Sequence, residues 1–226
     1  MIMNIDMHVH TNVSSICSSI DICLMIDYAK HIGLDAICVT DHDTLYGARV
    51  AEKIGREKDF LIFKGMEVNT VEGDFLVFGL EEDIEEGKYT AEEMLKMVAA
   101  SGGAAIAAHP YRRFKRALGD KIFSLTDCHA IEVKNGNTPG MLNEVARSAA
   151  LQLKLPGVGG SDAHQLNEIG RFYTQFKYPV TNEQELIEAI KSGEYEAMTR
   201  VFDHNIQPAG IKDTSNHMRK NFSQNL

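Results

Sequence analysis

The sequence is poor in cysteine, has no long apolar run and carries no surplus of positive charge. Its four cysteines form no C-x-x-C pair and are too sparse for a secreted disulfide scaffold. No window approaches the roughly 18 apolar residues of a membrane span. The first residues lack the basic and apolar regions of a signal peptide. We therefore expect a soluble protein of the reducing cytoplasm with no membrane partner.

The net charge also limits the partners. A formal charge of −9 argues against general affinity for polyanions, so we expect no stable complex with nucleic acid. A concentrated group of divalent cations would nevertheless reverse the local sign and hold a phosphate. The overall charge therefore leaves a phosphorylated substrate open.

The chain length and composition predict one globular unit. Its 226 residues, 44% of them hydrophobic and 24% charged, suffice for one sizeable core. We expect this unit to span residues 1–200. From about residue 201 the sequence turns polar, which predicts a loose tail or docked arm at 201–226.

Short apolar runs alternate with longer segments of helical periodicity. This alternation is typical of repeated β-α units around a parallel sheet. Strands are predicted at Ile2–Val9, Asp35–Thr40, Phe60–Val68, Ala104–Ala108, Ala130–Lys134, Gly157–Gly160 and Phe172–Phe176. Helices are predicted at Ile20–Ile32, Leu45–Glu57, Thr90–Ala100, Pro139–Gln152 and Asn182–Ser192. A Glu-Gly-Asp turn predicts a hairpin within Thr70–Gly79.

Residues of metal-ligand type close five of the predicted strands: His8 and His10, Asp41 and His42, Glu67, His109, and Asp162 and His164. In a parallel β/α barrel such positions converge on one pocket. The i, i+2 spacing of each H-x-H or D-x-H pair places both side chains on one face of a strand. Imidazoles with carboxylates suit zinc, manganese or iron, and the absence of thiolate pairs argues against a closed structural zinc site. One buried histidine alone is more often a hydrogen-bonded core residue; the joint placement favours an open, reactive metal site.

Five motifs then carry a family resemblance: D-M-H-V-H-T at 6–11, T-D-H-D-T at 40–44, G-M-E at 65–67, H-P at 109–110 and G-S-D-A-H at 160–164. E-V-K-N at 132–135 and R-F-Y-T at 171–174 extend it. The set resembles the polymerase and histidinol phosphatase (PHP) family. The resemblance implies a distorted seven-stranded (β/α)7 TIM-like barrel, two or three divalent metal ions (zinc, manganese or iron) and hydrolysis of phosphate esters.

The ligands implied by the resemblance are His8, His10, His42, Glu67, His109, Asp162 and His164. Asp41 and Asp6 are then expected to orient neighbouring imidazoles. This chain departs from the family pattern at two positions that would help to bind a third metal ion. Many family members place an Asp or His in the loop after H-x-H-T, where this chain offers only Ser14, Ser15 or Cys17. Trinuclear members supply a further histidine before the H-P motif, and Asp74 is the stand-in here.

Asp162 and His109 are the predicted catalytic residues, with Asp162 both binding metal and accepting a proton from the attacking water. Arg112, Arg113 and Arg171 are candidate phosphate contacts, and Asn135 a candidate contact to the leaving group. The alternative for the arginines is ordinary surface charge.

These residues favour a phosphoesterase acting on a nucleotide or another small phosphorylated metabolite. The same chemistry would serve a nuclease that trims short oligonucleotides, since both break phosphate esters. A different class is a non-catalytic scaffold similar to the protein subunits of ribonuclease P, for which lost ligands and a basic surface are expected. A metal-bound but inactive regulatory protein is also compatible with the motifs.

Overall fold

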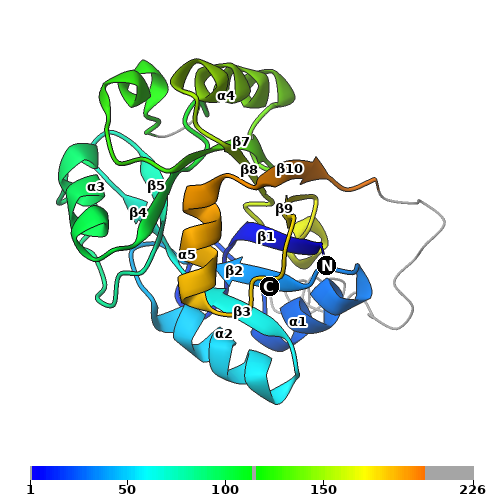
Figure 1. Cartoon of the computed structure of the whole chain (residues 1–226). Coiled ribbons are helices and arrows are strands. Elements are labelled where there is room, and N and C mark those ends of the chain that lie inside the picture. The colour runs from blue at the N-terminus through cyan, green and yellow to red at the C-terminus, as the bar shows by residue number, and fades with distance from the viewer. Residues whose placement is uncertain (1, 114–115, 202–226) are drawn as a thin grey trace, which may run out of the picture.

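The computed structural model describes residues 2–113 and 116–201 (Figure 1). This part of the chain folds into two five-stranded sheets with helices on their outer faces. The strand orders are β10-β9-β1-β2-β3 and β4-β5-β6-β7-β8. The expected α/β class is confirmed.

The first sheet contains the start of the chain and its last described strands. β1 (Met3–Val9), β2 (Ala36–Val39) and β3 (Leu61–Lys64) are parallel neighbours. β9 (Phe172–Phe176) pairs antiparallel with β1, and β10 (Tyr195–Thr199) pairs antiparallel with β9. The expectation that the Phe172–Phe176 strand is parallel to the others was therefore wrong, and β10 was not predicted.

The second sheet contains the predicted hairpin. β4 (Met66–Asn69) and β5 (Asp74–Phe78) are antiparallel, and β6 (Ala104–Ala107) lies antiparallel to β5. β7 (Ala130–Asn135) and β8 (Gly157–Gly160) continue the sheet in parallel with β6. β4, β6, β7 and β8 thus run in one direction, and their carboxyl ends share one edge.

All five predicted helices are present: α1 (Ile22–His31), α2 (Tyr46–Glu57), α3 (Ala91–Ala100), α4 (Gly140–Leu153) and α5 (Glu183–Ser192). Two 3-10 turns, Gly119–Ser124 and Leu166–Glu168, were not predicted. Asn182 caps α5 by accepting a hydrogen bond from the backbone of Glu185, as its side chain at this position predicts.

The predicted seven-stranded barrel is not confirmed, because no single ladder closes around the described strands. The described strands form two separate ladders, which are joined by isolated bridges of Val9 with Ala163 and of His42 with Glu67. The predicted strand Phe60–Val68 breaks at Gly65 into β3 and β4. A side chain there would collide with its neighbours, since a Cβ would lie 2.7 Å from the ring of Phe78.

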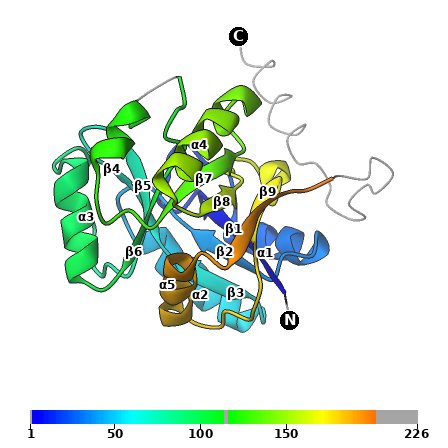
Figure 2. The same cartoon turned by 45° about the horizontal axis from the view of Figure 1, so that its top comes forward.

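One hydrophobic cluster ties the two sheets together under α5. Leu186 and Ile190 of this helix pack in the same cluster as Phe78 and Phe176, one from each sheet. The helix itself lies where the two sheets approach each other (Figures 1 and 2). The cluster also contains residues at the amino ends of the parallel strands, such as Ala36 and Ala104. One end of the sheets is thereby covered by apolar packing, which leaves the carboxyl ends for polar side chains.

Within the described residues, no helix combines the length and the apolar character needed to cross a bilayer. The predicted tail at 201–226 lies outside the described residues except for Val201.

Candidate metal centre

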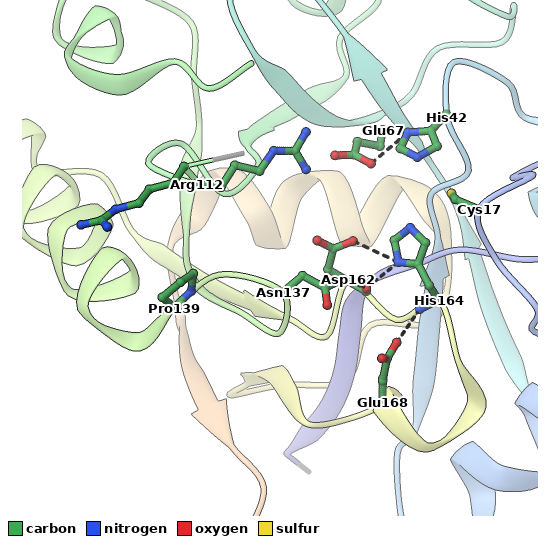
Figure 3. Close-up of a pocket in the computed structure, with 10 residues that line it drawn as sticks. Cys17, His42, Glu67, Arg112, Asn137, Pro139, Asp162, His164 and Glu168 are labelled. Atoms are coloured by element: carbon green, nitrogen blue, oxygen red, sulfur yellow. Dashed lines mark hydrogen bonds and ion pairs between the residues drawn. The ribbon is translucent and has the colours of Figure 1, made fainter. Parts of the chain in front are cut away.

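All seven predicted ligands lie close together at the carboxyl ends of the strands, and four of them line a cavity there: His42, Glu67, Asp162 and His164. The seven come from β1 and the residues after it, the loop after β2, strand β4, and the loops after β6 and β8. Five are buried and two are half-buried, the latter being His42 and His164. The cavity measures about 330 Å³, and both of these residues line it (Figure 3).

The centre of the site is formed by two imidazoles and two carboxylates. His8 Nε2 lies 3.0 Å from His10 Nε2. Glu67 Oε2 lies 3.4 Å from the first nitrogen and 3.3 Å from the second. Asp162 Oδ1 lies 3.5 and 3.4 Å from the same two atoms. Four ligand-type atoms from three distant parts of the sequence therefore surround one point.

Hydrogen bonds at the far side of each ring fix which nitrogen faces this point. His8 Nδ1 donates to Glu132 Oε1 at 3.1 Å. His10 Nδ1 lies 3.3 Å from Ser15 Oγ, and Ser15 in turn donates to Asp41 Oδ1 at 2.8 Å. With the protons on Nδ1, both Nε2 atoms present lone pairs to one another. Two lone pairs and two carboxylates in contact repel one another unless a cation lies between them, so the donor set fits a metal ion.

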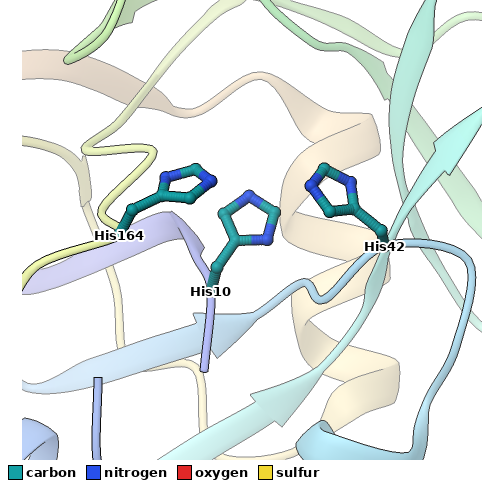
Figure 4. Close-up of side chains that lie close together, drawn as sticks. All are labelled: His10, His42 and His164. Atoms are coloured by element: carbon teal, nitrogen blue, oxygen red, sulfur yellow. The ribbon is translucent and has the colours of Figure 1, made fainter. Parts of the chain in front are cut away.

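His42 and His164 flank His10 at the mouth of the cavity (Figure 4). His164 Nδ1 donates to the backbone oxygen of Asp162 at 2.9 Å, which leaves its Nε2 free to bind an ion. His42 Nδ1 lies 3.1 Å from Glu67 Oε2. The described residues contain three overlapping groups able to hold an ion: His10, His42 and His164; His8, His10 and Asp162; and His8, Glu67 and His109.

The electrostatics match this donor set. Without a bound ion, burial opposes ionisation of Glu67, but a proton on His8 and hydrogen bonds from His10, His109 and His42 hold its pKa well below the ordinary value. A bound cation would take the place of those protons and leave the imidazoles neutral, with their lone pairs facing the ion. Burial likewise opposes ionisation of Asp162, and His8 and His10 still hold its pKa far below normal. The two carboxylates are thus anionic at neutral pH, which favours cation binding.

Asp41 and Asp6 lie behind the site rather than in it. Asp41 accepts from the backbone and the hydroxyl of Thr11, each at 2.6 Å, and from Ser14 and Ser15. It therefore holds the loop after β1 and reaches His10 through Ser15. Asp6 was expected to orient an imidazole, but it accepts backbone N–H groups of Ser161, Gly170 and His8 instead. Burial raises the pKa of Asp6 to about 6.

Glu132 is the buried acid that the sequence reasoning missed as a site residue. It accepts from His8 Nδ1 and, at 2.8 Å, from the backbone N–H of His109. The sequence feature that indicates this role is an acidic residue within the largely apolar strand β7, A-I-E-V-K-N. Glu168 was also missed; its carboxylate accepts from the backbone of His164 at 2.8 Å.

The predicted substrate contacts fall into two groups. Arg112 and Arg113 line the cavity. Arg171 is exposed and is not among the residues lining it. Asn135, the predicted contact to the leaving group, is fully buried, and its amide donates to Asp162 Oδ2 at 3.1 Å and to Glu132 Oε2 at 3.0 Å. It therefore holds the carboxylate oxygen of Asp162 that does not face His8 and His10.

The residues considered for a third ion lie in three different places. Ser15 is buried between His10 and Asp41. Cys17 is exposed and lines the cavity on the side of His42 and His164 (Figure 3). Asp74 is buried and forms an ion pair with Arg112.

Comparisons with known proteins agree on one family. The model of the PHP domain matches residues 6–112, and the model described as PHP-associated matches residues 140–195. The uncharacterized protein MJ1587 of Methanocaldococcus jannaschii is 32% identical over 160 residues, which cover 66% of this chain and 92% of that protein.

Two solved structures show the same fold at low identity. One is a two-domain protein of Bacteroides vulgatus containing a predicted PHP-like metal-dependent phosphoesterase, with a TM-score of 0.71 and 19% identity. The match covers 88% of this chain and 65% of that protein, so the chain spans slightly less than two thirds of its length. The other is the lesion-specific endonuclease PfuEndoQ of Pyrococcus furiosus, with a TM-score of 0.62, 19% identity, and coverage of 88% of this chain and 58% of that one.

Proposed function

The chain belongs to the PHP domain family, and on that premise we propose that it hydrolyses the phosphate ester of a nucleotide or another small phosphorylated metabolite. The observation that carries the proposal is the convergence of His8, His10, Glu67 and Asp162 at 3.0–3.5 Å around one point. A buried donor set of this kind suits zinc, manganese or iron.

We assign a first ion to these four residues and a second to His42 and His164 beside His10. When bound, the ions would supply Lewis-acid chemistry that activates water and neutralises phosphate oxygens. Asp162 has one carboxylate oxygen facing the ligands and the other held by Asn135, so it is oriented to accept a proton from the attacking water. His109 holds the second oxygen of Glu67 at 2.7 Å and keeps that carboxylate in place.

The size and lining of the cavity support a small substrate. About 330 Å³ is at the lower end of the roughly 300–1,000 Å³ typical of small-molecule pockets. Arg112 and Arg113 supply guanidinium groups for a phosphate at its wall. Cysteines that are few and form no C-x-x-C pair suit a reducing compartment, and on this basis we place the protein in the cytoplasm.

We also propose that the two bridged sheets act as one distorted barrel within a catalytic unit at residues 1–200. The support is that ligands from both sheets meet in one cavity.

A nuclease of short oligonucleotides is the second candidate, since PfuEndoQ combines this fold with an endonuclease activity. The limited cavity favours the small ester over the polymer. A ribonuclease P-like scaffold is the third candidate, and the complete ligand set together with a net charge of −9 speaks against it.

The deciding experiment combines metal analysis with an ester panel. Purified protein is analysed for bound metal and assayed, with manganese or zinc, on nucleotides, nucleoside bisphosphates, histidinol phosphate and short RNA, with Asp162→Ala as control. We expect bound metal and turnover of a small monoester that the control lacks. Preference for RNA would select the nuclease. A metal-free protein inactive across the panel would overturn the proposal.

A further inference from the structure

Arg112 is mostly buried and contacts a predicted metal ligand directly. Its Nη1 lies 3.1 Å from His109 Nε2, and its Nη2 pairs with the carboxylate of Asp74. The arginine side chain is 17% exposed and that of Asp74 only 1%. The guanidinium is therefore clamped between a buried acid and a histidine of the ligand set.

His109 Nε2 contacts both a carboxylate oxygen and a guanidinium N–H, and neither protonation state of the ring satisfies both contacts. The same nitrogen lies 2.7 Å from Glu67 Oε1 and 3.1 Å from Arg112 Nη1. If it carries a proton, it donates to Glu67 and meets the N–H of Arg112 without accepting it. If it carries the lone pair, it accepts from Arg112 and faces the oxygen of Glu67. With a proton on Nε2, two N–H donors would face each other; with the lone pair, the always-charged guanidinium donates to the nitrogen and offsets the negative charge of the Glu67 oxygen, as a metal ion would.

A divalent ion and this guanidinium compete for the same position. An ion bound by His109 Nε2 would lie at about 2.0–2.1 Å along the lone pair. The guanidinium already lies against that nitrogen, and two cations in contact repel strongly in a buried site. Either the ion or the guanidinium can occupy the side of the centre formed by His109, Glu67 and Asp74.

Asp74 favours the guanidinium in this competition. It was the candidate stand-in for the extra histidine of trinuclear relatives, yet its carboxylate holds Arg112. Burial and the nearby charge of Glu67 raise the pKa of Asp74, while Arg112 lowers it. Three buried atoms of this group, Asp74 Oδ1, His109 Nδ1 and Arg112 Nε, have no hydrogen-bond partner among the described residues. The ion pair with Arg112 offsets the cost of burying the Asp74 carboxylate, because a buried charge is strongly destabilising without a partner of opposite charge.

We propose that the guanidinium of Arg112, anchored by Asp74, occupies one cation position of this centre in place of a divalent ion. The inference rests on the proposed function only in assuming that the centre binds metal. Because Arg112 also lines the cavity, its remaining N–H groups can meet a phosphate oxygen where a relative would present an ion.

The test counts metal ions per chain in the absence of substrate, by elemental analysis after saturation with manganese and removal of free metal. Arg112→Met removes the charge at similar length, and Arg112→Gln keeps a neutral amide able to bond Asp74. We expect both variants to bind one further ion per chain than the wild type. The control is Arg113→Met, which removes a neighbouring arginine of the same cavity. This control should bind as many ions as the wild type, and so should the double variant of Asp74→Asn with Arg112→Met.

Equal ion counts in the wild type and in the folded Arg112 variant, Met or Gln, would overturn the proposal, as would a gain in Arg113→Met. The Gln variant decides the result if the Met variant does not fold. The outcome is independent of catalysis, since a wild type that binds metal but hydrolyses no ester would defeat the proposed function and leave the ion counts interpretable.

Discussion

At the scale of single residues, the proposed metal centre depends on side chains that hydrogen-bond the ligands and do not themselves contact an ion. Glu132 fixes the ring of His8, and Ser15 with Asp41 fixes the ring of His10. Asn135 fixes the carboxylate of Asp162. Each side chain removes one rotational or tautomeric choice from a ligand, which raises the affinity of the centre without touching the ion.

The first prediction concerns Asp162. Asp162→Asn replaces a carboxylate oxygen that faces His8 and His10 with an amide of the same shape, so packing is retained while the negative charge and the proton acceptor are lost. We expect turnover to fall by a factor of at least about 100, as is common for general bases, with little change in the urea midpoint of the metal-free protein. Equal losses of turnover and stability would assign Asp162 a structural role instead.

The second prediction concerns Glu132, which lies one step behind the ligands. Glu132→Gln keeps the volume but weakens the acceptor for His8 Nδ1. We expect metal affinity to fall about 10–100-fold, the usual effect of losing such a partner, as measured by competition with a chromogenic chelator. Glu144→Gln, on the exposed surface of α4, is the matched control and should leave the affinity unchanged. An unchanged affinity in Glu132→Gln would contradict the assigned role.

At the scale of elements, the break between β3 and β4 is what brings Glu67 into the site. Backbone bonds from Gly65 to Val39 and from Glu67 to Asp41 continue the parallel pairing across the break. After it, β4 turns into the hairpin with β5, which also positions Asp74. The bend needs a residue without a side chain, because Phe78 and Thr40 lie where a Cβ would be.

The third prediction tests this bend. Gly65→Ala should destabilise the protein by about 1–3 kcal/mol, the usual cost of overpacking a closed core, as measured by urea unfolding. Gly140→Ala, where a Cβ would meet nothing within 4 Å, is the control and should be neutral or slightly stabilising at the start of α4. Similar results for both variants would show that the bend tolerates a side chain.

At the scale of the whole molecule, we expect metal binding and folding to be coupled, because the predicted ligands come from both sheets and meet only in the folded state. Glu67 lies on β4 and His109 follows β6 of the second sheet, whereas His8 lies on β1 of the first sheet and His10 follows that strand. An ion that binds only the native state stabilises it by an amount that grows with the ratio of free metal to Kd.

The fourth prediction follows from this coupling. Removal of metal with a chelator should lower the Tm, and titration with manganese or zinc should restore it in a concentration-dependent manner. At a free metal concentration of 100 Kd, the free energy of unfolding should rise by about 2.7 kcal/mol. The measurement is differential scanning fluorimetry. Magnesium is a useful comparison, since nitrogen-rich sites bind it weakly. A Tm that is independent of chelator and of added metal would contradict a native metal centre.

The sequence by itself determined which residues form the centre and at which ends of the strands they lie. Spacings such as His8 with His10 are local, so the period-2 alternation of a strand suffices to place both imidazoles on one face. The helices were equally predictable, since Thr90 with Glu93 and Asn182 with Glu185 mark their starts through contacts three residues apart.

Only the tertiary structure decided the direction of Phe172–Phe176, the burial of Asn135, the role of Glu132 and the pairing of Asp74 with Arg112. The partners in these contacts are separated by 27 residues for Asn135 and Asp162, by 38 for Asp74 and Arg112, and by 124 for His8 and Glu132. No local pattern encodes which distant side chain a buried polar atom will meet, because that choice is made when the sheets pack and every buried donor and charge must find a partner.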